Sequence, residues 1–203
     1  MTLVQRMPQE TVETARKRLT LAAEDLDANR VAGLVTELAD DSGVTQLWEQ
    51  VCVPLLSRLP GRDAGEIVVE HVLAEGIRVG LDVLGRVPGQ PLPPGGLLLA
   101  GAEQESHCLG LHALAAALRQ QRRGCLMLGA ALPWSALASA VRRARPHTVL
   151  VWSQTPVTGR AYRLVRFSRD FPSVRVFGAG PGWVEPLTAP VGRLTSLTAA
   201  AQL

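Results

Sequence analysis

A proline- and glycine-rich segment, Arg86 to Gly96, divides this chain of 203 residues into two parts with different sequence patterns. Before it, apolar residues recur at helical spacing; after it, short apolar runs alternate with amphipathic stretches. Because proline cannot continue a helix or pair inside a sheet, such a segment is typical of a linker. We therefore predict two domains, residues 1–86 and 97–203, joined by a linker at 87–96.

The first part predicts a small bundle of helices. Apolar residues recur every three or four positions from about residue 8 to residue 85, with a break at Asp41-Ser42-Gly43. Pro54 is expected to kink or divide the helix that contains it. Asp63 and Glu66 have the spacing of a capping box, which predicts the start of the best-defined helix, running to about Leu84.

The second part alternates between apolar runs and amphipathic stretches. The runs predict strands at 97–101, 125–128, 148–152 and 174–177, and the stretches between them predict helices at 107–121, 134–145 and 157–170. The tail, residues 191–203, predicts an edge strand and a short helix. Such alternation implies a parallel sheet with right-handed crossovers. The expected fold class is α/β: an N-terminal helical bundle cap followed by a flavodoxin- or Rossmann-like doubly wound parallel sheet.

The loop after the first predicted strand carries the pattern Glu-x-His-x-x-Gly. This loop lies at the carboxyl edge of the sheet, where open α/β folds bind ligands. An imidazole can bind a metal through one nitrogen while an acid holds the N–H of the other, and glycine permits close approach of a bulky ligand. The candidate ligand-binding residues of this loop are Glu105, Ser106, His107 and Gly110.

Two further loops at the same edge carry residues that suit a ligand. Ser153 and Thr155 place hydroxyl groups after the third predicted strand, and the glycines Gly178, Gly180 and Gly182 follow the fourth. A backbone without side chains can lie flat against a large ligand. The alternative interpretation is a flavodoxin-like domain in which these are ordinary turn glycines and helix-capping hydroxyls.

Together the three loops resemble the signature of corrinoid-binding domains, Asp-x-His-x-x-Gly followed by a serine motif and a glycine pair. The resemblance implies that His107 is the lower axial ligand of cobalt in cobalamin, and that Gly110, the two hydroxyl residues and the three later glycines line a channel for its nucleotide tail. Glu105 stands where the family has aspartate. Its extra methylene puts the hydrogen bond to His107 in question, although Glu105 remains the expected orienting partner.

The upstream helices resemble the cap of methionine synthase and of light-responsive cobalamin regulators. Gly65-Glu66-Ile67 and Glu70-His71 match part of the cap motif, which implies that Glu70 and His71 face the upper side of cobalt, with His71 a possible upper ligand. A satisfied bundle histidine is the alternative for His71. Pro60 or Arg62 stands where the regulators have a tryptophan over the adenosyl group. We therefore expect hydroxo- or aquocobalamin to be preferred over the adenosyl form.

The domain order and the arginine-rich composition resemble the AerR/PpaA antirepressor family of purple photosynthetic bacteria, over about residues 25 to 190. The resemblance implies a light-responsive, cobalamin-binding transcriptional regulator, a photoreceptor that binds a PpsR/CrtJ-type repressor protein of photosystem gene expression. The arginines recurring at every third position from Arg160 to Arg169 form either an interface for such a partner or a solvated face.

Other functions remain open or are disfavoured. The main alternative is a corrinoid carrier protein of a methyltransferase system, in which cobalt performs the chemistry. We expect no catalytic residues of the protein itself, because Ser153 has no evident base and no Gly-x-Ser-x-Gly elbow occurs. The net charge of +3, without a helix-turn-helix or zinc finger, does not favour direct DNA binding. Three widely spaced cysteines and the lack of a signal sequence or membrane span predict a cytoplasmic protein.

Overall fold

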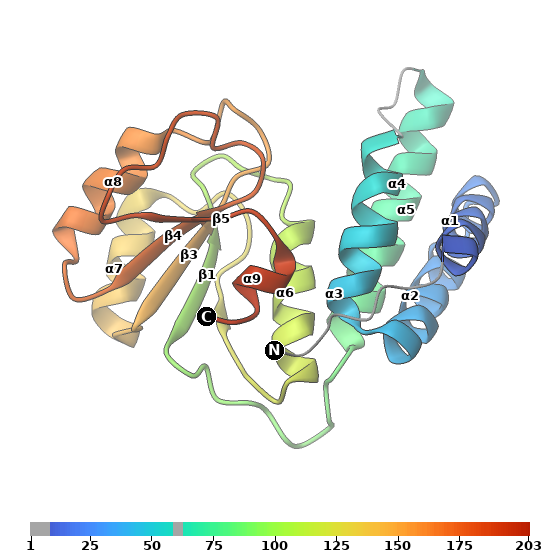
Figure 1. The fold of residues 1–203 in the computed structure, drawn as a ribbon, viewed down its shortest axis with the longest axis horizontal. Coiled ribbons are helices and arrows are strands. Elements are labelled where there is room, and N and C mark those ends of the chain that lie inside the picture. Colours follow the sequence, from blue (N-terminus) through green and yellow to red (C-terminus); the bar gives the residue numbers. More distant parts are fainter. Residues whose placement is uncertain (1–8, 59–62) are drawn as a thin grey trace. The chain divides into compact units, whose positions relative to one another are not determined.

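The computed structural model describes residues 9–58 and 63–203. The chain divides into two compact units, Met1–Arg86 and Val87–Leu203, each of which is described by itself. The first unit is helical and the second is a parallel sheet with helices on both faces (Figure 1). This arrangement confirms the predicted fold class. Within the described residues, no helix is both long enough and apolar enough to span a membrane.

The described residues of the helical unit form three long helices and a segmented one. The long helices are α1 (Gln9–Glu24), α2 (Ala28–Ser42) and α5 (Ala64–Val83). The segmented helix consists of α3 (Val44–Gln46), a π-helical stretch (Leu47–Cys52) and α4 (Val53–Arg58). Asp63 accepts a hydrogen bond of 2.9 Å from the backbone N–H of Glu66, so the start of α5 has the predicted cap.

Pro54 explains the irregular helix. Because proline has no N–H, it cannot donate to the carbonyl of Gln50 four residues earlier. The guanidinium of Arg16, on α1, donates to that carbonyl oxygen at 2.5 Å instead. The π-helical stretch ends at Cys52, two residues before Pro54, and α4 begins at Val53. The division predicted at Pro54 is therefore present as a change of helix type, with a side chain from another helix satisfying the carbonyl oxygen.

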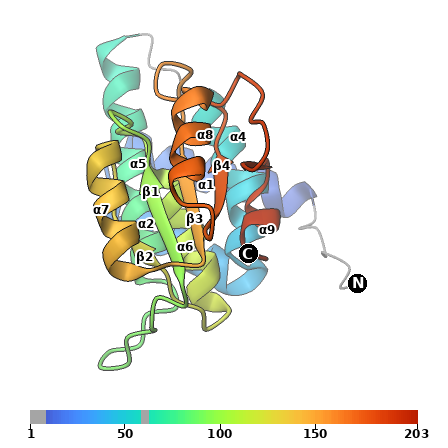
Figure 2. The same ribbon diagram turned by 90° about the vertical axis from the view of Figure 1, so that its left-hand side faces the viewer.

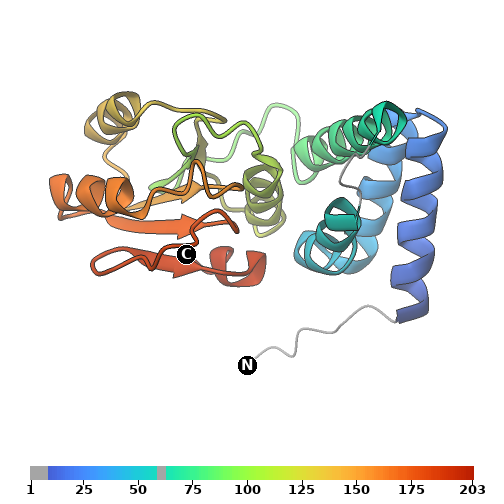
Figure 3. The ribbon, with the colours of Figure 1, turned by 90° about the horizontal axis from the view of Figure 1, so that it is seen from above.

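Two glycines of α5 allow it to pack closely on α2. A Cβ on Gly76 would lie 2.4 Å from Cβ of Val31, and a Cβ on Gly80 would lie 2.8 Å from the carbonyl oxygen of Ala32. The two helices run side by side along this contact (Figure 3). The absence of side chains at these positions is therefore what sets the distance between the helices.

The second unit contains five strands, all parallel to their neighbours, in the order β2-β1-β3-β4-β5. β1, β3 and β4 run side by side at the centre of the unit (Figure 2). From β1 the chain crosses to β2 on one side and then to β3 on the other, so the strand order reverses between β1 and β3. Ligands of open α/β folds bind at such a reversal. The strands are β1 (Leu97–Gly101), β2 (Leu126–Met127), β3 (Thr148–Trp152), β4 (Arg175–Ala179) and β5 (Gly192–Leu194).

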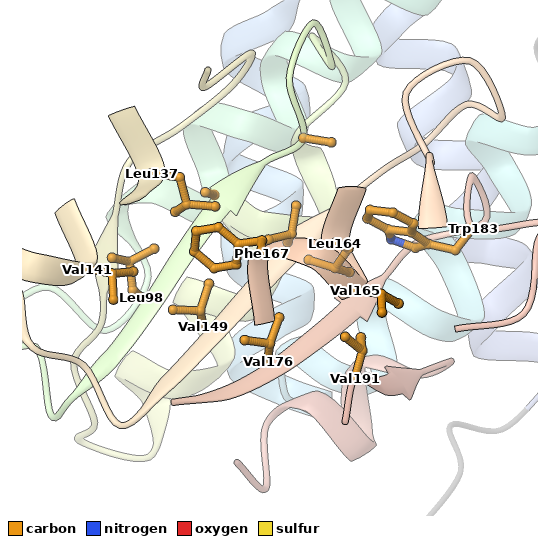
Figure 4. Close-up of a cluster of buried hydrophobic side chains, with 13 residues drawn as sticks. Leu98, Leu137, Val141, Val149, Leu164, Val165, Phe167, Val176, Trp183 and Val191 are labelled. Carbon is orange, nitrogen blue, oxygen red and sulfur yellow. The ribbon is translucent and has the colours of Figure 1, made fainter. Parts of the chain in front are cut away.

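Helices cover both faces of the sheet. On one face lie α6 (Leu109–Gln120) and α9 (Leu197–Ala200), and on the other lie α7 (Trp134–Ala144) and α8 (Ala161–Asp170) (Figure 1). The core beneath α7 and α8 consists of apolar side chains from these helices, the strands and the segment after β4 (Figure 4). Its buried members are Leu98, Ala100, Ala102, Leu137, Val141, Val149, Val151, Leu164, Val165, Phe167, Val176, Trp183 and Val191.

Two helices begin later than the sequence pattern predicts. α6 begins at Leu109 rather than His107, and α8 begins at Ala161 rather than Val157. In each case the missing residues are held in a loop by hydrogen bonds to one carboxylate, that of Glu105. The backbone N–H of His107 and the hydroxyl of Thr158 both donate to it. A polar contact between two loops therefore determines where the helices start.

Candidate functional site

The candidate site lies on the loops that follow β1 and β3, where the strand order reverses. The two loops are tied together at their bases, because the backbone N–H of Ala102 donates to the carbonyl oxygen of Trp152 at 2.8 Å. The loop after β1 then turns back, with the N–H of Glu105 donating to the carbonyl oxygen of Ala102 at 2.9 Å. The sheet thus brings Glu105 and the residues after Trp152 to the same place.

His107 is held by Glu105 through two hydrogen bonds to one oxygen. Its ring Nδ1 lies 2.8 Å from Oε1 of Glu105, and its backbone N–H donates to the same oxygen at 2.9 Å. An ionised carboxylate can only accept, so the ring proton sits on Nδ1 and leaves the lone pair of Nε2 free for a metal. The His107 side chain is 66% exposed. The hydrogen bond that the longer glutamate put in question is therefore made.

The extra methylene of Glu105 lets its second oxygen reach the other loop. Oε2 accepts from the backbone N–H groups of Gln154, at 2.8 Å, and Thr155, at 3.1 Å. It also accepts from the hydroxyl of Thr158 at 2.5 Å. The Glu105 side chain is only 1% exposed, yet every polar neighbour is a donor. The carboxylate therefore fixes His107 and joins the loop after β1 to the loop after β3.

The donors around Glu105 keep it ionised. Burial alone raises the pKa of Glu105, but the hydrogen bonds from Thr158, the backbone of His107 and Gln154, and the His107 ring together lower this pKa to about 2. Cys108 shows the opposite effect. Burial, together with the nearby charge of Glu105, raises the pKa of the Cys108 thiol to about 11. At neutral pH the site therefore combines an ionised acid and a protonated thiol.

Thr158 is a site residue that the sequence pattern did not reveal. Its hydroxyl donates to Glu105 and lies 2.7 Å from the hydroxyl oxygen of Ser153, which is fully buried. The hydroxyl of Ser153 also donates to the carbonyl oxygen of Thr155 at 3.0 Å. The only signal in the sequence was the recurrence of hydroxyl residues at 153, 155 and 158. The sequence pattern predicts that Thr158 lies in a helix, so it gives no sign of the contact with Glu105.

The predicted glycines pack against the chain itself. A Cβ on Gly180 would lie 2.2 Å from the carbonyl oxygen of Ser153, and a Cβ on Gly182 would lie 2.3 Å from the Ser153 hydroxyl. A Cβ on Gly178 would lie 2.5 Å from Cδ1 of Leu187, a partly buried residue that packs against the core. Gly110, at the start of α6, lies against the indole of Trp152. Gly180 and Gly182 therefore pack against the loop after β3, while Gly178 packs against side chains of the core.

The remaining candidates lie on exposed surfaces. Ser106 is exposed beside His107. On α5 of the helical unit, His71 is exposed and Glu70 is partly buried. Pro60 and Arg62, the positions considered for the missing tryptophan, lie outside the described residues. Trp48, on the π-helical stretch, is buried in the helical unit. Within the described residues, no three His, Cys, Asp or Glu side chains group together to hold a metal ion.

Comparison with known proteins shows similarity of fold but not of sequence. No protein-family model matches the chain, and no curated protein matches it in sequence. Among solved structures, the monomethylamine corrinoid protein of Methanosarcina barkeri superposes with a TM-score of 0.67 at 15% identity, over 94% of this chain and 96% of that one. The two proteins share a fold. The likeness extends through both units, so the order of a helical segment followed by a parallel α/β unit is common to both chains.

Two other solved structures are more distant. The methanol:cobalamin methyltransferase complex MtaBC of Methanosarcina barkeri gives a TM-score of 0.48 at 14% identity, over 98% of this chain and 83% of that one. A cobalamin-binding protein of Desulfitobacterium hafniense DCB-2 gives 0.43 at 14% identity, over 91% and 94%. Neither likeness is close enough to bear on the site.

Proposed function

We propose that this protein binds cobalamin, with Nε2 of His107 as the lower axial ligand of cobalt. The observation that carries the proposal is the chain of contacts from Thr158 to Glu105 to His107. It fixes the imidazole with its proton on Nδ1 and its free nitrogen on an exposed ring, which is how proteins prepare a histidine for a metal. A corrin ring supplies four nitrogens of its own, so a single protein ligand is enough.

The other residues have consistent roles in this proposal. The resemblance to corrinoid-binding domains implies that Gly110, the hydroxyl loop after β3, and Gly180 and Gly182 after β4 surround the nucleotide tail. Gly178 packs against Leu187 instead. Ser106 lies beside the ligand. For Glu70 and His71 of α5, the resemblance to the cap of cobalamin regulators implies a role on the upper side of cobalt, with His71 a candidate upper ligand. The form bound is hydroxo- or aquocobalamin in preference to adenosylcobalamin.

For the use of the cofactor, we propose a light-responsive antirepressor in the cytoplasm that acts on a PpsR/CrtJ-type repressor protein. Bound cobalamin would supply a cobalt centre whose upper ligand light can change. The protein's part is to hold the lower ligand fixed, so that any change falls on the upper side. The partner would bind a surface altered by that change. What supports this use is the sequence resemblance to the AerR/PpaA antirepressor family.

A second candidate is a corrinoid carrier protein of a methyltransferase system. It is favoured by the fold shared with the Methanosarcina barkeri monomethylamine corrinoid protein across nearly the whole of both chains. The same His107 would then hold the cofactor while a partner enzyme reaches its upper side. The two candidates differ in what the loaded protein does: a regulator changes its partner binding with light, and a carrier accepts and delivers methyl groups.

The binding proposal is tested by adding hydroxocobalamin in darkness, desalting, and recording the absorption spectrum. We expect the wild type to retain a red cofactor with shifted bands and His107→Ala to lose it. His112→Ala, on α6, is the matched control and retains the cofactor. If the wild type emerges colourless, the proposal is wrong.

The antirepressor and the corrinoid carrier are distinguished by experiments on the wild-type protein with cobalamin bound. Light-dependent association with a PpsR/CrtJ-type repressor supports the antirepressor. Methyl transfer with a corrinoid activase and a methyl donor enzyme, without any effect of light on repressor binding, overturns it in favour of the carrier.

A further inference from the structure

Trp152, the last residue of β3, fills the space between the start of α6 and the loop after β4. A Cβ on Gly110 would lie 2.3 Å from Cη2 of the indole and 2.6 Å from Cζ2. A Cβ on Gly180 would lie 3.1 Å from Cδ2 of the same ring. Both glycines belong to the set expected to surround the nucleotide tail. The indole therefore occupies part of the place assigned to that tail.

The N–H group of the Trp152 indole lacks a hydrogen-bond acceptor among the described residues. Its Nε1 is buried and has no hydrogen-bond partner among residues 9–58 and 63–203. By contrast, Nε1 of the buried Trp183 donates to the carbonyl oxygen of Ala179 at 2.9 Å. A buried donor without an acceptor costs free energy, and that cost is recovered when the donor reaches water or a ligand. The Trp152 ring can therefore leave its place at less cost than its buried area suggests.

We propose that Trp152 is a specificity-determining residue whose indole must leave the space beside Gly110 and Gly180 before a corrinoid with a nucleotide tail can bind. The inference rests on the proposed function. Once His107 binds cobalt, the base of the tail is free of the metal and needs a place of its own. A space walled by glycines that holds one planar aromatic ring accepts another of similar size. A corrinoid without the tail, cobinamide, leaves the indole undisturbed.

The expected effect is a change in relative affinity. Exposing on the order of 60 Å² of indole surface corresponds to about a tenfold weakening of binding. We expect Trp152→Ala to bind cobalamin about tenfold more tightly relative to cobinamide than the wild type does. Trp152→Leu, which keeps an apolar group in the same place, shifts the ratio in the same direction by less. It replaces the alanine variant if that variant does not fold.

The test is titration of the full-length protein with aquocobalamin and with aquocobinamide, followed by absorption. Trp134→Ala is the matched control, because Trp134 is also partly buried but packs on Phe167 in the core beneath α7 and α8. Its affinity ratio should equal that of the wild type. If the Trp152 variants also keep the wild-type ratio, the inference is wrong while cobalamin binding stands. If no variant and no wild type binds either corrinoid, the proposed function fails, and the inference with it.

Discussion

At the scale of single residues, one buried carboxylate organises the site. Glu105 accepts hydrogen bonds from two loops, and its removal affects both the orientation of His107 and the connection between the loops after β1 and β3. Aspartate at this position would be one methylene shorter. The longer side chain therefore keeps the contact to histidine and still reaches Thr158.

Glu105→Gln tests this organisation through stability and its pH dependence. Every neighbour of the carboxylate is a donor, so the amide NH₂ of glutamine must face another donor. We expect a loss of about 3 kcal/mol in the free energy of unfolding at pH 7. Because the folded pKa of Glu105 is about 2, below its usual 4.5, the wild-type advantage is full above pH 4.5 and disappears as the pH falls toward 2.

The measurement is denaturant unfolding of both proteins at pH 7 and near pH 3. Glu103→Gln is the control, since Glu103 lies in the same loop but is partly exposed and pairs with Arg163 at 2.7 Å. It should change stability by no more than about 0.5 kcal/mol. An equal difference between wild type and Glu105→Gln at both pH values would contradict the assignment.

The sequence predicts the contact between Glu105 and His107 but not the contact between Glu105 and Thr158. Glu105 and His107 could be paired from sequence because they are two positions apart in a recognisable motif. Thr158 could not, since its contact depends on how β1 and β3 align in the sheet. The position of the Trp152 indole was missed for the same reason: an apolar residue at the end of a strand gives no sign of which glycine it will meet.

At the scale of elements, close packing of α2 and α5 depends on the lack of side chains at Gly76 and Gly80. Gly76→Ala should destabilise the protein by about 1–3 kcal/mol, because its Cβ would overlap Val31 and the Ala28 carbonyl oxygen. Gly33→Ala, within α2, is the matched control. A Cβ there meets nothing within 4 Å, so the same change should stabilise by about 1 kcal/mol.

Thermal or denaturant unfolding of the two variants tests whether Gly76→Ala lowers the free energy of unfolding while Gly33→Ala raises it. Equal effects of both substitutions would mean that helix propensity alone matters and that the contact between α2 and α5 is loose.

Element boundaries show where periodicity is a sufficient guide. β1 and β3 begin and end where their apolar runs do, because each is buried and flanked by polar loops. α6 and α8 begin late, because side-chain contacts with Glu105 hold their predicted first residues in loops. The spacing of apolar residues indicates which side chains are buried. It gives no information on a hydrogen bond, such as those to Glu105, that keeps residues in a loop and out of a helix.

At the scale of the whole molecule, the alternation of strands and helices was enough to predict a doubly wound sheet. The reversal of strand order between β1 and β3 then brings the Glu105 loop and the Thr158 loop together. It follows that the topology, and not any single motif, creates the site. The fold itself is shared with the Methanosarcina barkeri monomethylamine corrinoid protein at 15% identity.

The most direct test of the central claim is the electron paramagnetic resonance spectrum of cob(II)alamin bound to protein containing ¹⁵N-histidine. One axial ¹⁴N nitrogen splits each cobalt line into three, and one ¹⁵N nitrogen splits it into two. Because the cofactor's own base is unlabelled, we predict two-line splitting that is absent in His107→Ala. Three-line splitting in the labelled wild type would show the cofactor's own base on cobalt and contradict ligation by His107.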